Sequence, residues 1–370
     1  MIISLDKKLL VEPLKAVSGV SEQKRGMAVL GNVLFKISEG ELLLACSDLE
    51  VQISARISCG VNEAISTTIP SKKLLEIVKA LSDEEEIKFN IEDTKTTITS
   101  AKSKFVLATI PAKEFPYVEQ KNEEKQKINI NALDRVISET SFSMAFNDAR
   151  HFLNGLFFEI KDERITAVAT DGHRLAMSTM PNTDKKGTNP TCIIPRKCIT
   201  ELRRILASFK DNKEMLAEVS INSKEITFNI DRFVVSGKLI EGTYPDYNKV
   251  FPGSLPNKLF VDKETLRAAL QRMSILSNDQ FKGVKLLINK TELKISTNNP
   301  LQEEGEDIMG CKYSGDSIEV GFNLNYLLEV IDVVGSKELC LELADSGSGC
   351  LISSGSKTSS NKYIIMPMRV

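Results

Sequence analysis

Residues 169 to 178, ATDGHRLAMS, hold the side chains that are most suggestive of chemistry in this chain. Asp171, His173 and Arg174 lie within four residues, and the sequence has only two histidines, the other being His151. An acid beside a histidine is a pairing that hydrolases use. Catalysis also requires a nucleophile that converges with these groups, which neighbouring residues in one segment do not demonstrate. Three interpretations stand: a hydrolase that uses Asp171 and His173, a turn with structural side chains, or a binding surface.

The residues around this segment indicate a turn. ITAVAT, residues 165–170, alternates as a strand does, and the Asp-Gly pair that follows is a strong signal for a tight hairpin turn. No metal-ligand spacing involves His173, and the seven cysteines are scattered without a CxxC pair. We therefore expect no metal, no cofactor, and free thiols in a reducing cytosol.

Length and composition limit the class of protein. A chain of 370 residues predicts two or three domains. Hydrophobic residues at 42% and charged residues at 26% are typical of a soluble protein, and no apolar run approaches the roughly 18 to 20 residues that cross a bilayer. The N-terminus lacks the pattern of a signal peptide, so we expect a cytoplasmic protein without a membrane partner. A net charge of −2 means that any nucleic-acid site must concentrate its positive charge on one face.

Internal repeats organise the chain. TTIPSKKLLEIVKAL at 67–81 recurs as TCIIPRKCITELRRIL at 191–206, and YLLEVIDVV at 326–334 matches its helical part. Each copy opens with an amphipathic helix behind Asp or Asn, at 6–18, 131–143 and 262–274, and a strand follows at 31–37, 154–160 and 283–288. The prediction is an α+β protein of three repeated domains, each with two helices packed on antiparallel sheets. Linker-like segments at 119–127 and 250–258 set the predicted domains at 1–125, 126–253 and 254–370.

Two of the repeats share a basic helical face. At 100° per residue, Arg196, Lys197, Arg203 and Arg204 fall on one side of the second-repeat helix, opposite Cys198, Ile199, Leu202, Ile205, Leu206 and Phe209. Lys72, Lys73 and Lys79 fall on the corresponding side in the first repeat, whereas the third repeat has Asn325, Tyr326 and Asp332. Such a face is either the solvated side of a surface helix or a contact for DNA phosphates. Without a base-reading motif, any DNA contact is expected to be independent of sequence.

ATDGHRLA, the IPRK helix start, the YPDY stretch and the C-terminal YIIMPMRV together resemble one family, the β subunit of bacterial DNA polymerase III, or β sliding clamp. The resemblance covers the whole chain and follows the repeats. It implies a head-to-tail homodimer that forms a closed ring of six domains around double-stranded DNA. The function implied is that of a non-catalytic processivity factor. Its implied partners are the clamp loader complex, the DNA polymerase III catalytic subunit, other polymerases and repair proteins, within a holoenzyme that includes a 3′–5′ exonuclease.

The resemblance also implies site residues. DNA contacts are expected from Lys24, Arg25, Lys72, Lys73, Lys79, Asn147, Arg150, His151, Phe152, Arg196, Lys197 and Arg203. A cleft for partner peptides is expected from Leu153, Thr170, Gly172, His173, Arg174, Leu175, Pro245, Val250, Tyr326, Ile364, Met366, Pro367, Met368 and Arg369. The dimer interface is expected from Lys73, Lys102, Lys104, Phe105, Ile275, Leu276, Glu303, Glu304 and Glu306.

Three features of this chain depart from the family pattern. Lys24 stands where the family has arginine, and Lys72 and Lys73 stand where it has an Arg-Lys pair, so the planar guanidinium fork is lost at Lys24 and Lys72. His151 and Phe152 replace paired tyrosines, and Gly347 and Gly349 replace larger residues, which predicts a wider or more flexible cleft. The alternative to a clamp is a repeat-built scaffold that binds proteins without encircling DNA.

Overall fold

A computed structural model describes residues 2–24, 26–82, 86–119, 124–184, 189–252, 255–278, 282–354 and 360–369. The chain folds into two compact units, one made of residues 1–131 and 197–239 and the other of residues 132–196 and 240–370. In the described ranges, no helix has the length and apolar character needed to span a bilayer.

The first unit combines a four-stranded sheet, ordered β1-β6-β7-β8, with an eight-stranded sheet, ordered β5-β2-β3-β4-β16-β15-β14-β9. Its helices are α1 (Lys7–Val17), α2 (Ser71–Ala80) and all but the first residue of α4 (Arg196–Ala207). Its strands are β1 (Ile2–Leu5), β2 (Asn32–Ser38), β3 (Glu41–Ser47), β4 (Val51–Ser58), β5 (Ile65–Pro70), β6 (Ile87–Ile91), β7 (Lys95–Ser100), β8 (Ser103–Ala108), β9 (Gln126–Asn129), β14 (Leu216–Ile221), β15 (Glu225–Ile230) and β16 (Phe233–Lys238).

The second unit combines a nine-stranded sheet, ordered β13-β10-β11-β12-β25-β24-β23-β17-β21, with a four-stranded sheet, ordered β20-β19-β18-β22. Its helices are most of α3 (Ile130–Ser138), α5 (Lys263–Ser274) and α6 (Leu324–Val333). Its strands are β10 (Gly155–Ile160), β11 (Arg164–Thr170), β12 (Arg174–Pro181), β13 (Thr191–Pro195), β17 (Asn257–Asp262), β18 (Gly283–Ile288), β19 (Glu292–Asn298), β20 (Glu304–Gly310), β21 (Lys312–Tyr313), β22 (Ile318–Asn323), β23 (Glu338–Leu343), β24 (Cys350–Ser354) and β25 (Asn361–Ile365).

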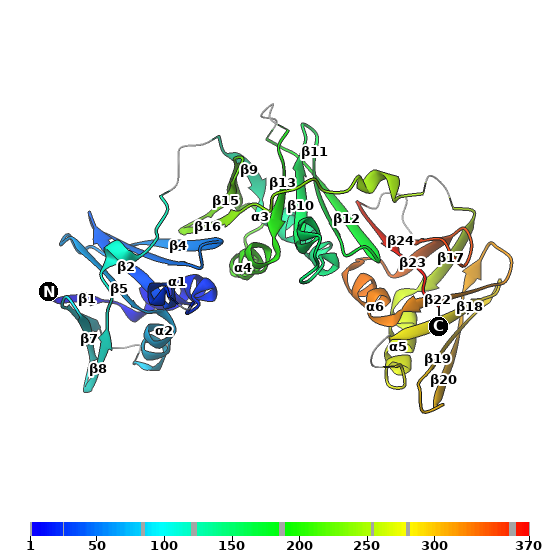
Figure 1. Ribbon diagram of the computed structural model, residues 1–370, viewed down its shortest axis with the longest axis horizontal. Helices are drawn as coiled ribbons and strands as arrows, with labels where there is room; N and C mark the ends of the chain where they lie inside the picture. The colour runs from blue at the N-terminus through cyan, green and yellow to red at the C-terminus, as the bar shows by residue number, and fades with distance from the viewer. Residues whose placement is uncertain are drawn as a thin grey trace. The chain divides into compact units, whose positions relative to one another are not determined.

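The strand orders confirm a threefold repeat. The pattern β5-β2-β3-β4 recurs as β13-β10-β11-β12 and as β22-β18-β19-β20, and the pattern β1-β6-β7-β8 recurs as β9-β14-β15-β16 and β17-β23-β24-β25. Figure 1 shows α1 beside α2 in the first repeat and α5 beside α6 in the third, each pair against its own sheets. Two helices on antiparallel sheets per repeat is the predicted arrangement.

Sheets continue from one repeat into the next. The antiparallel pair β4–β16 joins the first and second repeats, and the antiparallel pair β12–β25 joins the second and third. In both cases the strand at the end of a repeat's first sheet, third in chain order, pairs with the strand at the end of the next repeat's second sheet, fourth in chain order. Among the strands that occupy these joining positions, β8 of the first repeat and β20 of the third pair with no strand of another repeat in the described part of the chain.

Local capping explains where the helices begin. The Asp6 carboxylate accepts a hydrogen bond from the backbone N–H of Lys8 at 2.8 Å, and the Asp262 carboxylate accepts one from Thr265 at 2.8 Å. In the second repeat Asn129, not the predicted Asn131, caps the helix, by accepting from the N–H of Asn131 at 3.1 Å. That helix also ends at Ser138, short of the predicted residue 143, and a separate 3-10 turn covers 141–143.

The buried and exposed sides of the helices are those predicted from the helical projection. On α4 the side chains of Cys198, Ile199, Leu202, Ile205 and Leu206 are buried. On α2 Leu74 and Val78 are buried, while Lys72, Lys73 and Lys79 are exposed. All seven cysteines are free.

Candidate functional site

The turn between β11 and β12 covers residues 171–174. Gly172 has φ +89°, a backbone conformation that side chains with a Cβ rarely adopt. One oxygen of the Asp171 carboxylate accepts hydrogen bonds from the N–H groups of His173 at 2.9 Å and Arg174 at 3.0 Å. The predicted Asp-Gly turn is therefore present, although it is wider than a two-residue hairpin.

Arg174 links this turn to the third repeat. Its side chain is 8% exposed, and its Nε donates to the second Asp171 oxygen at 3.0 Å while Nη2 donates to the carbonyl of Phe142 at 2.8 Å. Nη1 contacts the carboxylate of Glu329 on α6, and the guanidinium lies 4.2 Å from the ring centre of Tyr326. A buried guanidinium needs such partners because losing water costs it free energy. Both oxygens of Asp171 thus brace the turn and its arginine, which is a structural role.

The C-terminal segment lies against the same turn. After β25, the N–H of Met366 donates to the carbonyl of His173 at 2.8 Å, and the N–H of Met368 donates to the carbonyl of Gly321 at 2.9 Å. These bonds hold the MPM residues beside the second-repeat turn at one end and the third-repeat sheet at the other. The terminal residues thereby form one wall of a surface that both repeats supply.

Apolar side chains form the floor of that surface. Leu153, Leu175 and Ile364 belong to one buried cluster. The Phe157 ring extends the cluster, because its centre lies 4.9 Å from that of Tyr244 and 5.8 Å from that of Tyr247. Beside this cluster, Val250, whose N–H donates to the carbonyl of Tyr247 at 3.1 Å, is 45% exposed, and Met366 is 43% exposed. An exposed apolar pair over an apolar floor suits a ligand with hydrophobic side chains.

The predicted cleft residues divide by exposure. Buried are Leu153, Arg174, Leu175 and Ile364; half-buried are Thr170, Tyr326, Pro367 and Met368; exposed are Gly172, His173, Pro245, Val250, Met366 and Arg369. The sequence did not single out Phe157, Tyr244 and Tyr247. The signal that the sequence offered for these residues was the YPDY stretch and the aromatic pair in NGLFFEI, residues 154–160.

Gly349 lies directly beneath this wall. A Cβ on Gly349 would stand 3.0 Å from Cγ2 of Ile364 and 3.2 Å from the sulfur of Met366. The glycine therefore lets the Met366 thioether settle close to β24. Gly347 instead takes part in a turn, where its N–H donates to Asp345 at 2.8 Å.

The predicted DNA-contact lysines of the first unit are largely at the surface. Lys72, Lys73 and Lys79 are exposed along α2. Lys24 is exposed as well, and its Nζ donates to the carbonyl of Asp48 at 2.8 Å. Arg25 lies outside the described residues.

Lys197 has acidic partners within the first unit. Its Nζ lies 2.5 Å from a carboxylate oxygen of the buried Asp48 and 3.2 Å from one of Glu22. Burial lowers the pKa of Lys197, but the hydrogen bond and charge of Asp48 outweigh it and leave that pKa raised. Arg203, nearly two turns further along α4, is exposed. The positive charge of the helical face predicted from the sequence is therefore partly neutralised by acidic residues that are distant in the sequence.

Arg196 is held by the loop after α3. It is half-buried; its Nη2 donates to the carbonyl of Ala145 at 3.1 Å and also contacts that of Met144. Burial is the main cause that lowers the pKa of Arg196, and the nearby Arg174 charge adds to it. The guanidinium thus organises the loop in addition to any contact with DNA.

Further along this loop, Asn147, Arg150 and His151 are exposed, and Phe152 packs against the apolar cluster beneath the cleft. The Arg150 guanidinium lies 2.8 Å from the Asp148 carboxylate and, through that hydrogen bond, lowers the pKa of Asp148 to about 2. The loop therefore presents polar groups from a preformed conformation.

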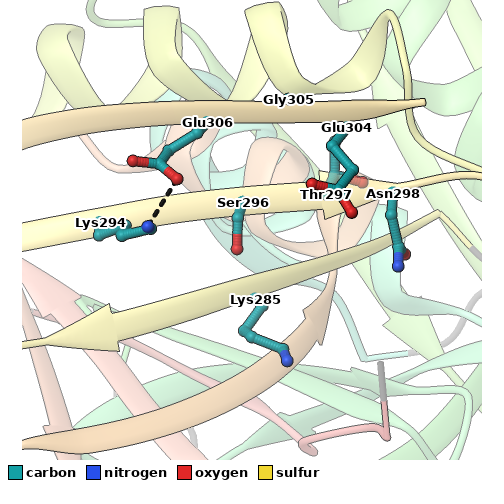
Figure 2. A pocket seen from close by; sticks show the side chains of 8 residues that line it. All are labelled: Lys285, Lys294, Ser296, Thr297, Asn298, Glu304, Gly305 and Glu306. Atoms are coloured by element: carbon teal, nitrogen blue, oxygen red, sulfur yellow. Dashed lines mark ion pairs between the residues drawn. The ribbon is translucent and has the colours of Figure 1, made fainter. Parts of the chain in front are cut away.

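Most of the predicted dimer residues lie on or beside the edge strands β8 and β20, whereas Lys73 is exposed on α2. Lys102 and Lys104 are exposed near and on β8, where Phe105 is half-buried, while Glu304 and Glu306 are exposed on β20 and Glu303 precedes it. Next to β20, Ile275 is 78% exposed and Leu276 is half-buried. A polar hollow of about 520 Å³ lies on the face of this sheet that carries Lys285, Lys294 and Glu306. Lys294 and Glu306 point toward one another there (Figure 2), and their charged groups are 2.5 Å apart.

Comparison with known proteins decides the family. Models of the N-terminal, central and C-terminal domains of the DNA polymerase III beta subunit match residues 1–119, 127–246 and 248–369. The chain belongs to the DNA polymerase III beta subunit family. It is 35% identical to the beta sliding clamp of Escherichia coli strain K12 and 37% identical to that of Haemophilus influenzae, with 100% of both chains covered in each case.

Solved structures of this family have the same fold. The DNA polymerase III subunit beta from Pseudomonas aeruginosa matches with a TM-score of 0.94 and 35% identity over 100% of both chains. A second crystal structure from that organism, of the sliding clamp bound to griselimycin, matches with a TM-score of 0.94 and 34% identity over 100% of both chains.

Family membership confirms the predicted three clamp domains and the predicted function. The chain is a DNA sliding clamp, a non-catalytic subunit that serves DNA replication. The hydrolase interpretation of Asp171 and His173 is thereby rejected, which agrees with the bracing role of Asp171. Within the described ranges, no three His, Cys, Asp or Glu side chains gather into a metal-binding group.

Proposed function

We propose that two copies of this chain close head to tail into a ring around duplex DNA in the cytoplasm. The domains of the ring are residues 1–125, 126–253 and 254–370. In this proposal the ring tethers the DNA polymerase III catalytic subunit, other polymerases, repair proteins and the clamp loader complex through the cleft beside Met366. The observation that carries it is the rule by which successive repeats join.

Successive repeats join by pairing the end strand of one repeat's first sheet with the end strand of the next repeat's second sheet. This joining rule leaves one strand in the first repeat and one in the third that can pair in this way only with a second copy. Within the chain, β4 pairs with β16 and β12 pairs with β25. Applied once more, the rule pairs β20 of the third repeat with β8 of the first repeat in a second copy. Such a contact is heterologous, so it closes only if the rotations complete a circle. It also covers edges that carry exposed apolar side chains, Val106 at 56% and Ile308 at 53%.

The β12–β25 pair supplies a register for this contact. In that pair Met177 faces Lys362 and Ala176 faces the fully buried Tyr363. The equivalent positions on the unpaired edges put Glu306 opposite Lys104 and Gly305 opposite Phe105. A lysine opposite a glutamate is a favourable cross-strand pair, and an aromatic ring opposite a glycine covers the backbone that the glycine leaves open.

DNA contact is assigned to the exposed cations. Lys72, Lys73, Lys79 and Arg203 have exposed side chains that phosphates can reach, and contacts of this kind hold DNA without choosing a sequence. Arg196 and Lys197 are half-buried and act mainly by positioning, through the Ala145 carbonyl and the Asp48 carboxylate. Weak ionic contacts of this type permit sliding.

The cleft is assigned to short partner peptides with apolar side chains. Val250 and Met366 present flexible or branched apolar groups over the Leu153, Leu175 and Ile364 floor. Methionine adapts its shape easily, which suits a surface that several partners share. Gly349 gives Met366 added room and supports a cleft that accepts bulky side chains.

Retention on DNA of defined topology tests the ring. The protein is loaded onto a nicked circular plasmid by the clamp loader with ATP, and the circle is then cut once. Retention on the circle with loss after linearisation supports encirclement, whereas equal retention on both forms contradicts it. Reversing Lys72, Lys79 and Arg203 to Glu should reduce retention, and reversing the exposed strand residue Lys36 is the matched control. Unchanged retention of the triple variant would favour the protein scaffold.

A further inference from the structure

Phe146 is a large apolar side chain that neither the cleft nor the ring edges account for. It is 77% exposed. Across the described ranges it is the one Phe or Tyr whose ring is largely exposed. Exposing a phenyl ring to water is unfavourable, and a loop that could fold it inward would do so.

The loop that carries Phe146 is fixed on both sides. Before it, the N–H of Ala145 donates to the carbonyl of Leu153 at 2.9 Å, and Arg196 donates to the carbonyl of Ala145 at 3.1 Å. After it, Asp148 and Asn154 exchange two hydrogen bonds, at 2.9 Å to the Asn154 oxygen and 2.8 Å from its amide nitrogen. The ring is therefore held out in solvent by the fold, which is the preorganisation expected of a contact residue.

A guanidinium lies beside this ring, and the same loop carries further polar side chains and Arg150, which is paired with Asp148. The Arg196 guanidinium lies 5.9 Å from the ring centre, and Asn147, Arg150 and His151 are exposed on the same loop. Asn147 itself has φ +55°, which turns the chain sharply after Phe146. An aromatic ring within a basic surface is the combination that binds single-stranded nucleic acid, because bases stack on the ring while cations meet the backbone phosphates.

We propose that Phe146 stacks on an unpaired nucleobase, so that the clamp recognises single-stranded DNA beside the duplex it encircles. In duplex DNA each base is already stacked and paired, and a phenyl ring gains access only by unstacking a step. Phe146 therefore discriminates single strands from duplex, whereas the lysines do not. This inference rests on the proposed function and deepens it, since it names a second DNA contact of a different kind.

The test uses the full-length protein and fluorescent oligonucleotides at low salt. Phe146→Ala should weaken binding to an oligo-dT strand about tenfold, and Phe146→Trp should restore it. Binding to a duplex of equal length and to an abasic strand should change less than about twofold, since no phosphate contact is removed. The matched control is Ile2→Ala, which removes a side chain that is 68% exposed on β1.

The remaining outcomes separate this inference from the ring proposal. Equal weakening on duplex and abasic strands, or no weakening on oligo-dT, would overturn base stacking. So would a loss of affinity for a cleft peptide in Phe146→Ala, because the ring would then belong to the peptide site. The ring proposal is tested separately, by retention of the wild type on the plasmid. Loss of the wild type after linearisation supports the ring whether or not Phe146 stacks on a base.

Discussion

Asp48 and Asp171 make the same turn in successive repeats. Asp48 accepts hydrogen bonds from the N–H groups of Glu50 at 2.9 Å and Val51 at 2.7 Å, as Asp171 does from His173 and Arg174. Each aspartate also forms an ion pair, Asp48 with Lys197 and Asp171 with Arg174. The segment that first suggested catalysis is therefore one copy of a repeated structural turn, and the repeat explains the aspartate without any reaction.

The two turns differ at the residue that follows the aspartate, and this difference predicts opposite effects on stability. Leu49 has φ +79° where Gly172 has φ +89°. Leu49→Gly should raise the free energy of unfolding by up to about 1 kcal/mol by relieving this strain, and Gly172→Ala should lower it by about 1 kcal/mol. Urea denaturation measures both variants. A loss of stability in Leu49→Gly would mean that the side chain contributes more than its backbone strain costs.

The Asp48–Lys197 pair predicts a dependence of stability on pH. Burial alone would raise the pKa of Asp48, but hydrogen bonds from Lys197, Val51 and Glu50 outweigh it, so this pKa lies below its usual value. A carboxyl group with a lowered folded pKa stabilises the fold above its unfolded pKa of about 3.9, and that contribution is lost as the pH falls through the folded value. Denaturation midpoints of wild type and Asp48→Asn, measured from pH 7 down to pH 3, should differ by a constant amount at neutral pH, and this difference should shrink as the pH falls below about 3.9. A constant difference across this range would contradict the role of ionised Asp48.

Local signals explain what could be predicted from the sequence. Asp6 and Asp262 cap helices through atoms a few residues away, and the buried face of α4 follows from its period. The partners of Arg196 and Lys197 are not local, because Ala145 and Asp48 reach them only after folding. A helical projection therefore gives the correct face while leaving open whether a cation on it is available to DNA. The joints between repeats are non-local in the same way, since β4 meets β16 and β12 meets β25 across long stretches of chain.

The proposed β8–β20 contact predicts the result of a charge swap. With Lys104 opposite Glu306 in the second copy, Glu306→Lys places two lysines against each other and should weaken the dimer about tenfold or more. Lys104→Glu should do the same, and the double variant should recover most of the affinity. Sedimentation velocity over a dilution series measures the dimer, with Glu319→Lys, on the exposed face of β22, as control. Equal weakening in single and double variants would reject this register, and unchanged dimers in all would reject the contact.

The cleft predicts which substitutions separate partner binding from ring formation. Met366→Ala removes an exposed thioether from the wall over Leu175 and Ile364, so affinity for a fluorescent peptide from a partner polymerase should fall about tenfold. Gly349→Val should also weaken binding, because its Cβ alone would stand 3.2 Å from the Met366 sulfur and must displace it. His173→Ala should weaken binding only slightly, since its ring is exposed while its backbone carbonyl, which holds Met366, is retained. Fluorescence anisotropy gives the affinities, and sedimentation of the same samples should show unchanged dimers, as the cleft and the β8 and β20 edges use different strands. If Met366→Ala bound the peptide as the wild type does, the apolar wall would have to be assigned to Val250 and its neighbours instead.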